Sequence, residues 1–170
     1  FEFQGQKCSA ASRAYLPASL WQQIKEQLLS TLAQIKMGEV TDFSNFVNAV
    51  IDEKAFDRIT AYIDRVKESN LASIIAGGNY DKSKGYFIEP TVIHAIDPMY
   101  ETMQEELFGP VLTVYVYSDE YFEDVLSLID QTSAYALTGC ILANDRYAIS
   151  LANKRLVNAA GNFYINDKPT

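Results

Sequence analysis

The chain has 170 residues, of which 48% are hydrophobic and 21% charged, and its formal net charge is −8. This length allows a single domain with a substantial core, and the composition is far from that of a disordered chain. The negative charge argues against nucleic acid or an anionic membrane as a main partner, and no apolar run approaches the roughly 20 residues that span a bilayer.

The first half of the chain predicts two helices. Apolar residues recur at helical spacing over 19–37, where Ser19 suits a helix N-cap and Gly38 suits the C-terminal end. A second apolar stripe predicts a helix from about Asp52 to Glu68.

From residue 71 onward the pattern changes to short runs of β-branched and aromatic residues, which predict strands. The predicted strands cover 71–76, 86–96, 111–117, 139–143 and 162–166. Between them, residues 118–120 begin a predicted helix that ends near Asp130, and Asn144 caps another that runs through Leu156. Alternating strands and helices predict an α/β fold with a largely parallel sheet covered by helices.

Cys8 is a candidate nucleophile because it stands in the polar stretch GQKCSA. The thiolate is the reactive form of cysteine, and a neighbouring cation or a helix N-terminus stabilises it. Lys7 precedes Cys8, and SAASR at 9–13 would offer free N–H groups if it began a helical turn. The alternative is a small buried filler, which is how we interpret Cys140 in the apolar run LTGCILA.

The spacing of the two cysteines fits neither a metal site nor a disulfide framework, so we expect no metal and a reducing compartment. His94 is the one histidine, and a thiol hydrolase would need it as the base for Cys8. Because His94 lies in a predicted strand, a structural role is the simpler interpretation. A Cys8–His94 hydrolase and a noncatalytic scaffold domain both stay open as alternatives.

The segment EELFGPV, residues 105–111, leads through a Gly-Pro turn into a predicted strand. Its turn therefore lies at the rim of the sheet, where loops often carry function, although an ordinary turn with Phe108 in the core would have the same sequence. None of the eight glycines forms a GxG pair, so the chain lacks a dinucleotide-binding fingerprint. Any cofactor is expected to be held mainly by another part of the protein.

Three motifs together resemble the catalytic domain of the aldehyde dehydrogenase family. They are FQGQKCSAASR, EELFGPV and AGNFYIN, and they follow one another in the family's order and spacing. The resemblance covers essentially all of residues 1–170. It implies a cysteine-bearing catalytic domain truncated at both ends, with the NAD-binding domain, the oxyanion-stabilising Asn and the general-base Glu outside this chain. The isolated chain is therefore expected to be inactive.

The resemblance also implies roles for individual residues. Cys8 would be the nucleophile that adds to an aldehyde and later carries a thioester, while its backbone N–H helps to hold the oxyanion. Glu106 would accept hydrogen bonds from the nicotinamide ribose of NAD, and Phe108 would pack against the nicotinamide. Lys7 and Ser9, which flank the nucleophile, would contact the substrate.

Within the family, GQKCSA, GYFIEPTV and GNFYINDK resemble the branch that oxidises glutamate semialdehyde to glutamate in proline catabolism. That branch implies NAD as cofactor, a small-molecule aldehyde as substrate, a homo-oligomer and a location in the mitochondrial matrix. Another class of aldehyde substrate stays open as an alternative.

Overall fold

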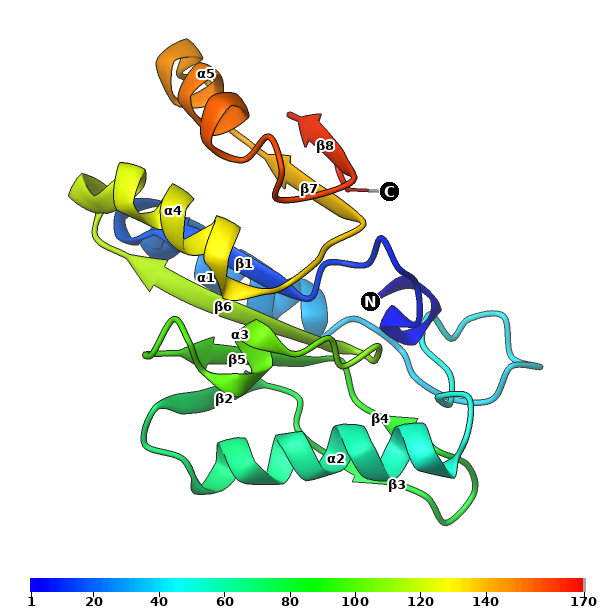
Figure 1. Cartoon of the computed structure of the whole chain (residues 1–170). Helices are drawn as coiled ribbons and strands as arrows, with labels where there is room; N and C mark the ends of the chain where they lie inside the picture. The colour runs from blue at the N-terminus through cyan, green and yellow to red at the C-terminus, as the bar shows by residue number, and fades with distance from the viewer. Residues whose placement is uncertain (170) are drawn as a thin grey trace.

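A four-stranded sheet organises the computed structural model, which describes residues 1–169 (Figure 1). The strand order is β1–β6–β5–β2. Its members are β1 (Arg13–Pro17), β6 (Val111–Tyr117), β5 (Thr91–Ala95) and β2 (Ala72–Ala76). The first three strands run parallel, and only β2 is antiparallel, to β5. This is the largely parallel sheet that the alternating pattern predicts.

Helices cover both faces of this sheet because side chains alternate along each strand. On one face, Val92 of β5 packs in a cluster with Trp21 of α1 (Ala18–Leu32). On the other face, Ile93 packs with Ile59 and Ile63 of α2 (Glu53–Glu68). In Figure 1, α1 lies behind β1 and β6, and α2 is drawn below the sheet.

The remaining elements surround this core. The short helix α3 (Glu101–Gln104) joins the α2 face, where the buried hydroxyl groups of Thr113 and Thr102 are hydrogen bonded at 2.9 Å. Two small sheets complete the strands: the hairpin β3 (Tyr80–Asp81) with β4 (Phe87–Ile88), and the parallel pair β7 (Thr138–Ile141) with β8 (Asn162–Ile165). The other helices are η1 (Glu2–Gly5), η2 (Asp119–Tyr121), α4 (Phe122–Thr132) and α5 (Arg146–Arg155). No helix within residues 1–169 is both long and apolar enough to cross a membrane.

The first predicted helix was wrong at both ends. It ends at Leu32 rather than 37, and Gly38 is not its cap. Instead the Gly38 N–H donates to the Val47 carbonyl at 3.0 Å, so hydrogen bonds to a distant segment replace a further helical turn. Ser19 is not the N-cap either, because the Asp119 carboxylate accepts hydrogen bonds from both the backbone N–H and the hydroxyl of Ser19.

Other predicted elements need smaller corrections. The second helix is confirmed, with Asp52 as its N-cap, and 111–117 is a strand over the whole predicted range. The predicted strand 86–96 divides into β4 and β5, with Glu89 and Pro90 between them. Asp145, not Asn144, caps α5. The stretch SAASR forms no helical turn: residues 8–9 make a turn, and the chain then extends into β1.

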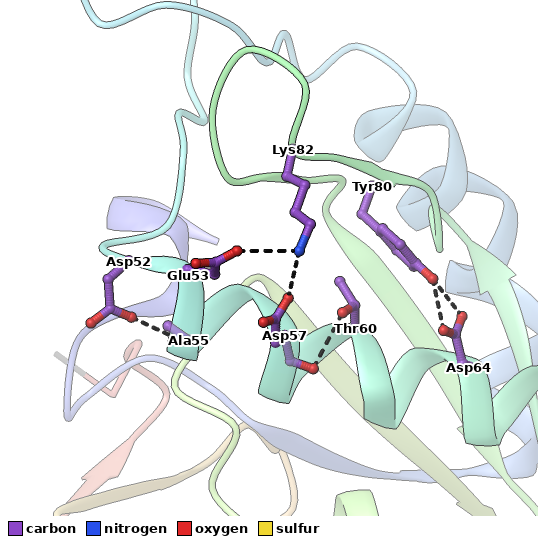
Figure 2. A network of polar contacts seen from close by, with 8 residues as sticks. All are labelled: Asp52, Glu53, Ala55, Asp57, Thr60, Asp64, Tyr80 and Lys82. Atoms are coloured by element: carbon purple, nitrogen blue, oxygen red, sulfur yellow. Dashed lines mark hydrogen bonds and ion pairs between the residues drawn. The ribbon is translucent and has the colours of Figure 1, made fainter.

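Polar contacts fasten the β3–β4 hairpin to α2 (Figure 2). Lys82 Nζ lies 3.3 Å from Glu53 Oε1 and 3.2 Å from Asp57 Oδ1, so it bridges two carboxylates one helical turn apart. Further along α2, the Tyr80 hydroxyl donates to the Asp64 carboxylate, whose oxygens lie 2.7 and 2.9 Å away. This hydrogen bond, and then Lys67, lower the pKa of Asp64 below its ordinary value.

Substituting Tyr80→Phe should raise the pKa of Asp64 toward its ordinary value, because the largest cause of the lowered pKa is removed. A carboxyl group with a lowered folded pKa stabilises the fold fully above its unfolded pKa, and this contribution is lost as pH falls through the folded value. Unfolding measured against pH should therefore show a shallower acid-side loss in the variant, and an NMR titration of Asp64 should report the pKa directly. Tyr86→Phe is the control. The rings of Tyr80 and Tyr86 both pack on Phe56, but the Tyr86 hydroxyl has no hydrogen bond within residues 1–169. An unchanged Asp64 pKa in Tyr80→Phe would contradict this account.

Candidate active site

The nucleophile loop, which we define as residues 3–12, presents Cys8 to solvent between η1 and β1. Three consecutive residues, Phe3, Gln4 and Gly5, have positive φ angles of 52°, 58° and 67°. The Ala10 N–H then donates to the Lys7 carbonyl at 2.9 Å, which closes a turn around Cys8. Because the thiol is exposed, the interpretation of Cys8 as a buried filler is wrong.

The sheet brings this loop to the segment Glu105–Gly109, which we call the rim turn. The nucleophile loop precedes β1 and the rim turn precedes β6, and these neighbouring strands run parallel. Their N-terminal ends therefore lie at the same edge of the sheet. The contact is between backbones: a Cβ atom added to Gly5 would lie 2.0 Å from the Gly109 carbonyl oxygen.

A recess lies between the two segments, floored by β6 and α3. Residues from all four structures line it: Gly5, Lys7, Ala10, Ala11, Ser12, Thr102, Glu105, Glu106, Leu107, Phe108, Gly109, Val111 and Thr113. Three of the predicted site residues, Lys7, Glu106 and Phe108, are among them, while Cys8 and Ser9 lie on the adjoining turn. The structure thus gathers the predicted residues in one region, and their individual roles stay predictions.

Glu106 and Phe108 are both exposed, whereas Leu107 between them is 4% exposed and belongs to the core on the α2 face. The interpretation of EELFGPV as a turn with Phe108 in the core is therefore wrong, because Leu107 fills that place. Phe108 has a φ of 51°, which is uncommon for a residue with a side chain. Phe108 is 37% exposed and borders the recess.

Lys7 is half-buried, and its charge has a partner in η1, just before the loop. Lys7 Nζ lies 3.5 Å from Glu2 Oε2 and 6.0 Å from the centre of the Phe3 ring. Both charged side chains are solvent-accessible, and exposed ion pairs contribute little free energy. The pair can therefore open at small cost if another anion, such as a substrate carboxylate, approaches.

His94 does not converge on Cys8. Its ring stacks on Trp21 of α1, with ring centres 6.3 Å apart and planes inclined by 20°. It is on the α1 face of the sheet, whereas Thr113 on the α2 face lines the recess. Burial, with a smaller effect of Lys25, lowers the pKa of His94. The geometry therefore gives no support to a Cys8–His94 hydrolase. Cys140 is half-buried in β7, where burial raises the pKa of its thiol.

Two arginines that the sequence did not single out as site residues fix the backbone around the recess. Arg13 Nη1 donates to the Met103 carbonyl at 2.8 Å, and Arg58 Nη2 donates to the Leu107 carbonyl at 2.7 Å. Arg13 is the last residue of the motif FQGQKCSAASR, but the partners of both arginines are backbone atoms, which every residue carries, so the sequence did not predict these contacts.

The third motif, AGNFYIN, lies outside the recess in the part of the chain that the structure describes. It supplies β8, which pairs with β7. Beyond β8, Asn166 has a φ of 55°, and its side-chain oxygen accepts a hydrogen bond from the Ala143 N–H at 2.8 Å. The motif therefore joins the last two strands in a fixed register.

Fold and site together define an α/β domain that presents an exposed cysteine against a Glu-Leu-Phe-Gly turn at one edge of a mostly parallel sheet. The chain belongs to the aldehyde dehydrogenase family, whose sequence pattern matches residues 1–170.

Proteins from different organisms are similar to this chain over its whole length. The chain is 59% identical over 170 residues to the mitochondrial Delta-1-pyrroline-5-carboxylate dehydrogenase of Dictyostelium discoideum and 50% identical over 171 residues to that of Homo sapiens. The crystal structure of the Delta-pyrroline-5-carboxylate dehydrogenase from Mycobacterium tuberculosis bound with NAD is 48% identical, with a TM-score of 0.90 over 98% of this chain. The chain spans 30% of the length of each of these proteins.

Proposed function

We propose that residues 1–170 form the cysteine-bearing catalytic domain of an NAD-dependent dehydrogenase that oxidises L-glutamate 5-semialdehyde to L-glutamate. The observation that carries this proposal is the backbone contact between Gly5 and Gly109, which places the Cys8 loop beside Glu106 and Phe108. The names of the relatives support the substrate, and the neighbour bound with NAD supports the cofactor.

In this mechanism the Cys8 thiolate adds to the aldehyde carbon. A sulfur–carbon bond forms, and the carbonyl π electrons move to oxygen, where the Cys8 N–H would donate to the oxyanion. NAD, when bound, supplies the acceptor for the hydride that leaves this adduct, and a thioester then remains on the Cys8 sulfur. Water cleaves the thioester, which releases glutamate and regenerates the thiol. Exposure of Cys8 allows both the aldehyde and the water to reach the sulfur.

The rim turn fits the nicotinamide end of NAD. Glu106 offers an exposed carboxylate that accepts hydrogen bonds from ribose hydroxyl groups, and Phe108 offers the face of a partly exposed ring at the same recess. The rest of the cofactor would be held by an NAD-binding domain elsewhere in the full-length protein. We therefore propose that the chain depends on that domain for turnover.

The substrate would be held beside the nucleophile. Lys7 would exchange its exposed partner Glu2 for the substrate carboxylate, and the half-exposed Ser9 hydroxyl would donate to the same group. We further propose a homo-oligomer in the mitochondrial matrix. The mitochondrial names of the Dictyostelium and human relatives support the compartment.

Full-length enzyme that contains residues 1–170 should reduce NAD with glutamate semialdehyde and prefer it to propanal, which lacks the amine and the carboxylate. We expect a ratio of kcat/KM values of about 100 or more, because each charged contact to a substrate is typically worth about tenfold. NADH formation under matched conditions measures this ratio. The Lys7→Gln enzyme should lose much of the preference and keep its rate with propanal. Absence of NADH formation with every aldehyde would refute the proposed function, and equal kcat/KM for both aldehydes would refute the proposed substrate.

A further inference from the structure

We propose that Arg58 is a positioning residue that holds the rim turn in the shape that binds NAD, an inference that rests on the proposed function. Arg58 lies on the second turn of α2, and its guanidinium crosses to a different segment of the chain. Its Nη2 atom donates to the Leu107 carbonyl oxygen at 2.7 Å in a part-buried hydrogen bond. Within residues 1–169, Arg58 forms no ion pair, so the guanidinium charge is directed to this carbonyl alone.

The acceptor is the carbonyl of Leu107, the residue that stands between the two residues proposed to contact NAD. The Leu107 C=O belongs to the same rigid peptide unit as the Phe108 N–H, so the direction of this carbonyl is coupled to φ of Phe108. That φ is 51°, in the left-handed region, where a residue with a side chain is held only by its surroundings. The bond from Arg58 fixes the plane of this peptide unit and thereby the direction of the Phe108 ring.

The next residue of α2 holds the other side of the rim turn. Ile59 is fully buried, and its Cδ1 atom would lie 2.5 Å from a Cβ atom added to Gly109. Ile59 and Leu107 also share the core cluster on this face. Three contacts therefore hold the rim turn: the buried Leu107 side chain, the hydrogen bond to the Leu107 carbonyl, and the close approach of Ile59 to Gly109. Arg58 supplies the hydrogen bond, which is the only polar contact of the three.

Binding of NAD to full-length enzyme tests the inference without relying on turnover. Arg58→Met keeps most of the aliphatic stem and removes the donor, Arg58→Lys keeps a cationic donor, and Arg65→Met is the control. Arg65 lies on the same helix, but its partner at 2.8 Å is the side chain of Glu101 and not a carbonyl of the rim turn. We expect Arg58→Met to raise the Kd of NAD by about tenfold, as loss of a hydrogen bond from a charged donor typically does. Arg58→Lys should recover part of this loss, and Arg65→Met should bind like the wild type.

Melting temperature and Cys8 alkylation, measured on the same variants, separate positioning from general destabilisation. Arg58→Met should melt no lower than Arg65→Met, and iodoacetamide should label its Cys8 at the wild-type rate. Wild-type NAD affinity in Arg58→Met would overturn the inference, as would an equal rise in Kd for Arg65→Met. If the wild-type enzyme itself fails to bind NAD, the proposed function is refuted, which is a different result from either of these.

Discussion

Replacing Cys8 by serine in the full-length enzyme should lower kcat/KM for aldehyde oxidation by about 10⁴-fold or more, the scale seen when an enzyme loses its nucleophile. A serine hydroxyl is almost wholly protonated at neutral pH, and His94, which could act as a base, stacks on Trp21 on the other face of the sheet. The melting temperature should hardly change, because Cys8 is exposed on a turn and contributes to none of the core clusters. NADH formation and thermal unfolding of the same preparation give the two measurements.

Two further substitutions are controls for the Cys8→Ser result. Cys140→Ser should retain activity, because the second thiol is half-buried in β7 away from the recess. His94→Asn should retain activity as well, since His94 stacks on Trp21 on the opposite face of the sheet. Loss of activity in His94→Asn together with full activity in Cys8→Ser would contradict the proposed mechanism. Loss of NADH formation in His94→Asn at an unchanged melting temperature would likewise contradict it, because His94 has no part in the proposed reaction.

The sequence predicts an element well when the signal that builds it is local. The helix at Glu53–Glu68 has a continuous apolar stripe and its own N-cap in Asp52, and both features lie within the segment. The strand Val111–Tyr117 is a β-branched and aromatic run that is paired on both sides in the sheet. In each case the side chains that define the pattern are the ones that become buried.

Elements that depend on distant partners were missed. β1 was not predicted, because Arg13–Pro17 includes a charged residue and a proline, and all five residues are half-buried without alternation. It is a strand because β6 lies beside it. Likewise the N-terminus of α1 is capped by Asp119, which is 100 positions away in the sequence. Neither pairing can be inferred from the residues adjacent to these elements.

The candidate site shows the same division. Cys8, Glu106 and Phe108 were identifiable because each stands in a motif whose combination resembles one family. The features that bring these motifs together were not identifiable: the Gly5–Gly109 approach and the Arg58 bond to Leu107 both involve backbone carbonyls. The helical turn expected after Cys8 was wrong because residues 13–17 join the sheet. Sequence therefore indicated the chemical groups, and only the fold revealed what positions them.

Gly5→Ala should damage the site more than any other small substitution in the nucleophile loop. The φ of Gly5 is 67°, where a side chain is strained, and the added Cβ would lie 2.0 Å from the Gly109 carbonyl oxygen. That oxygen belongs to the backbone, so the two loops must separate. We expect kcat/KM to fall by about 100-fold, the typical effect of displacing a reacting group by about 1 Å, and the free energy of unfolding to fall by about 2–4 kcal/mol.

Gly77→Ala is the matched control that assigns the loss of activity to the site. Gly77 has a φ of 70°, and an added Cβ would lie 2.2 Å from the Pro90 carbonyl oxygen, so strain and overlap are nearly the same as at Gly5. It follows β2, however, and lines no part of the recess. Gly77→Ala should therefore lose similar stability, yet its folded fraction should keep wild-type kcat/KM and wild-type labelling of Cys8 by iodoacetamide. If the two variants lose kcat/KM equally, the loss follows from stability, and the contact between the nucleophile loop and the rim turn does not position Cys8.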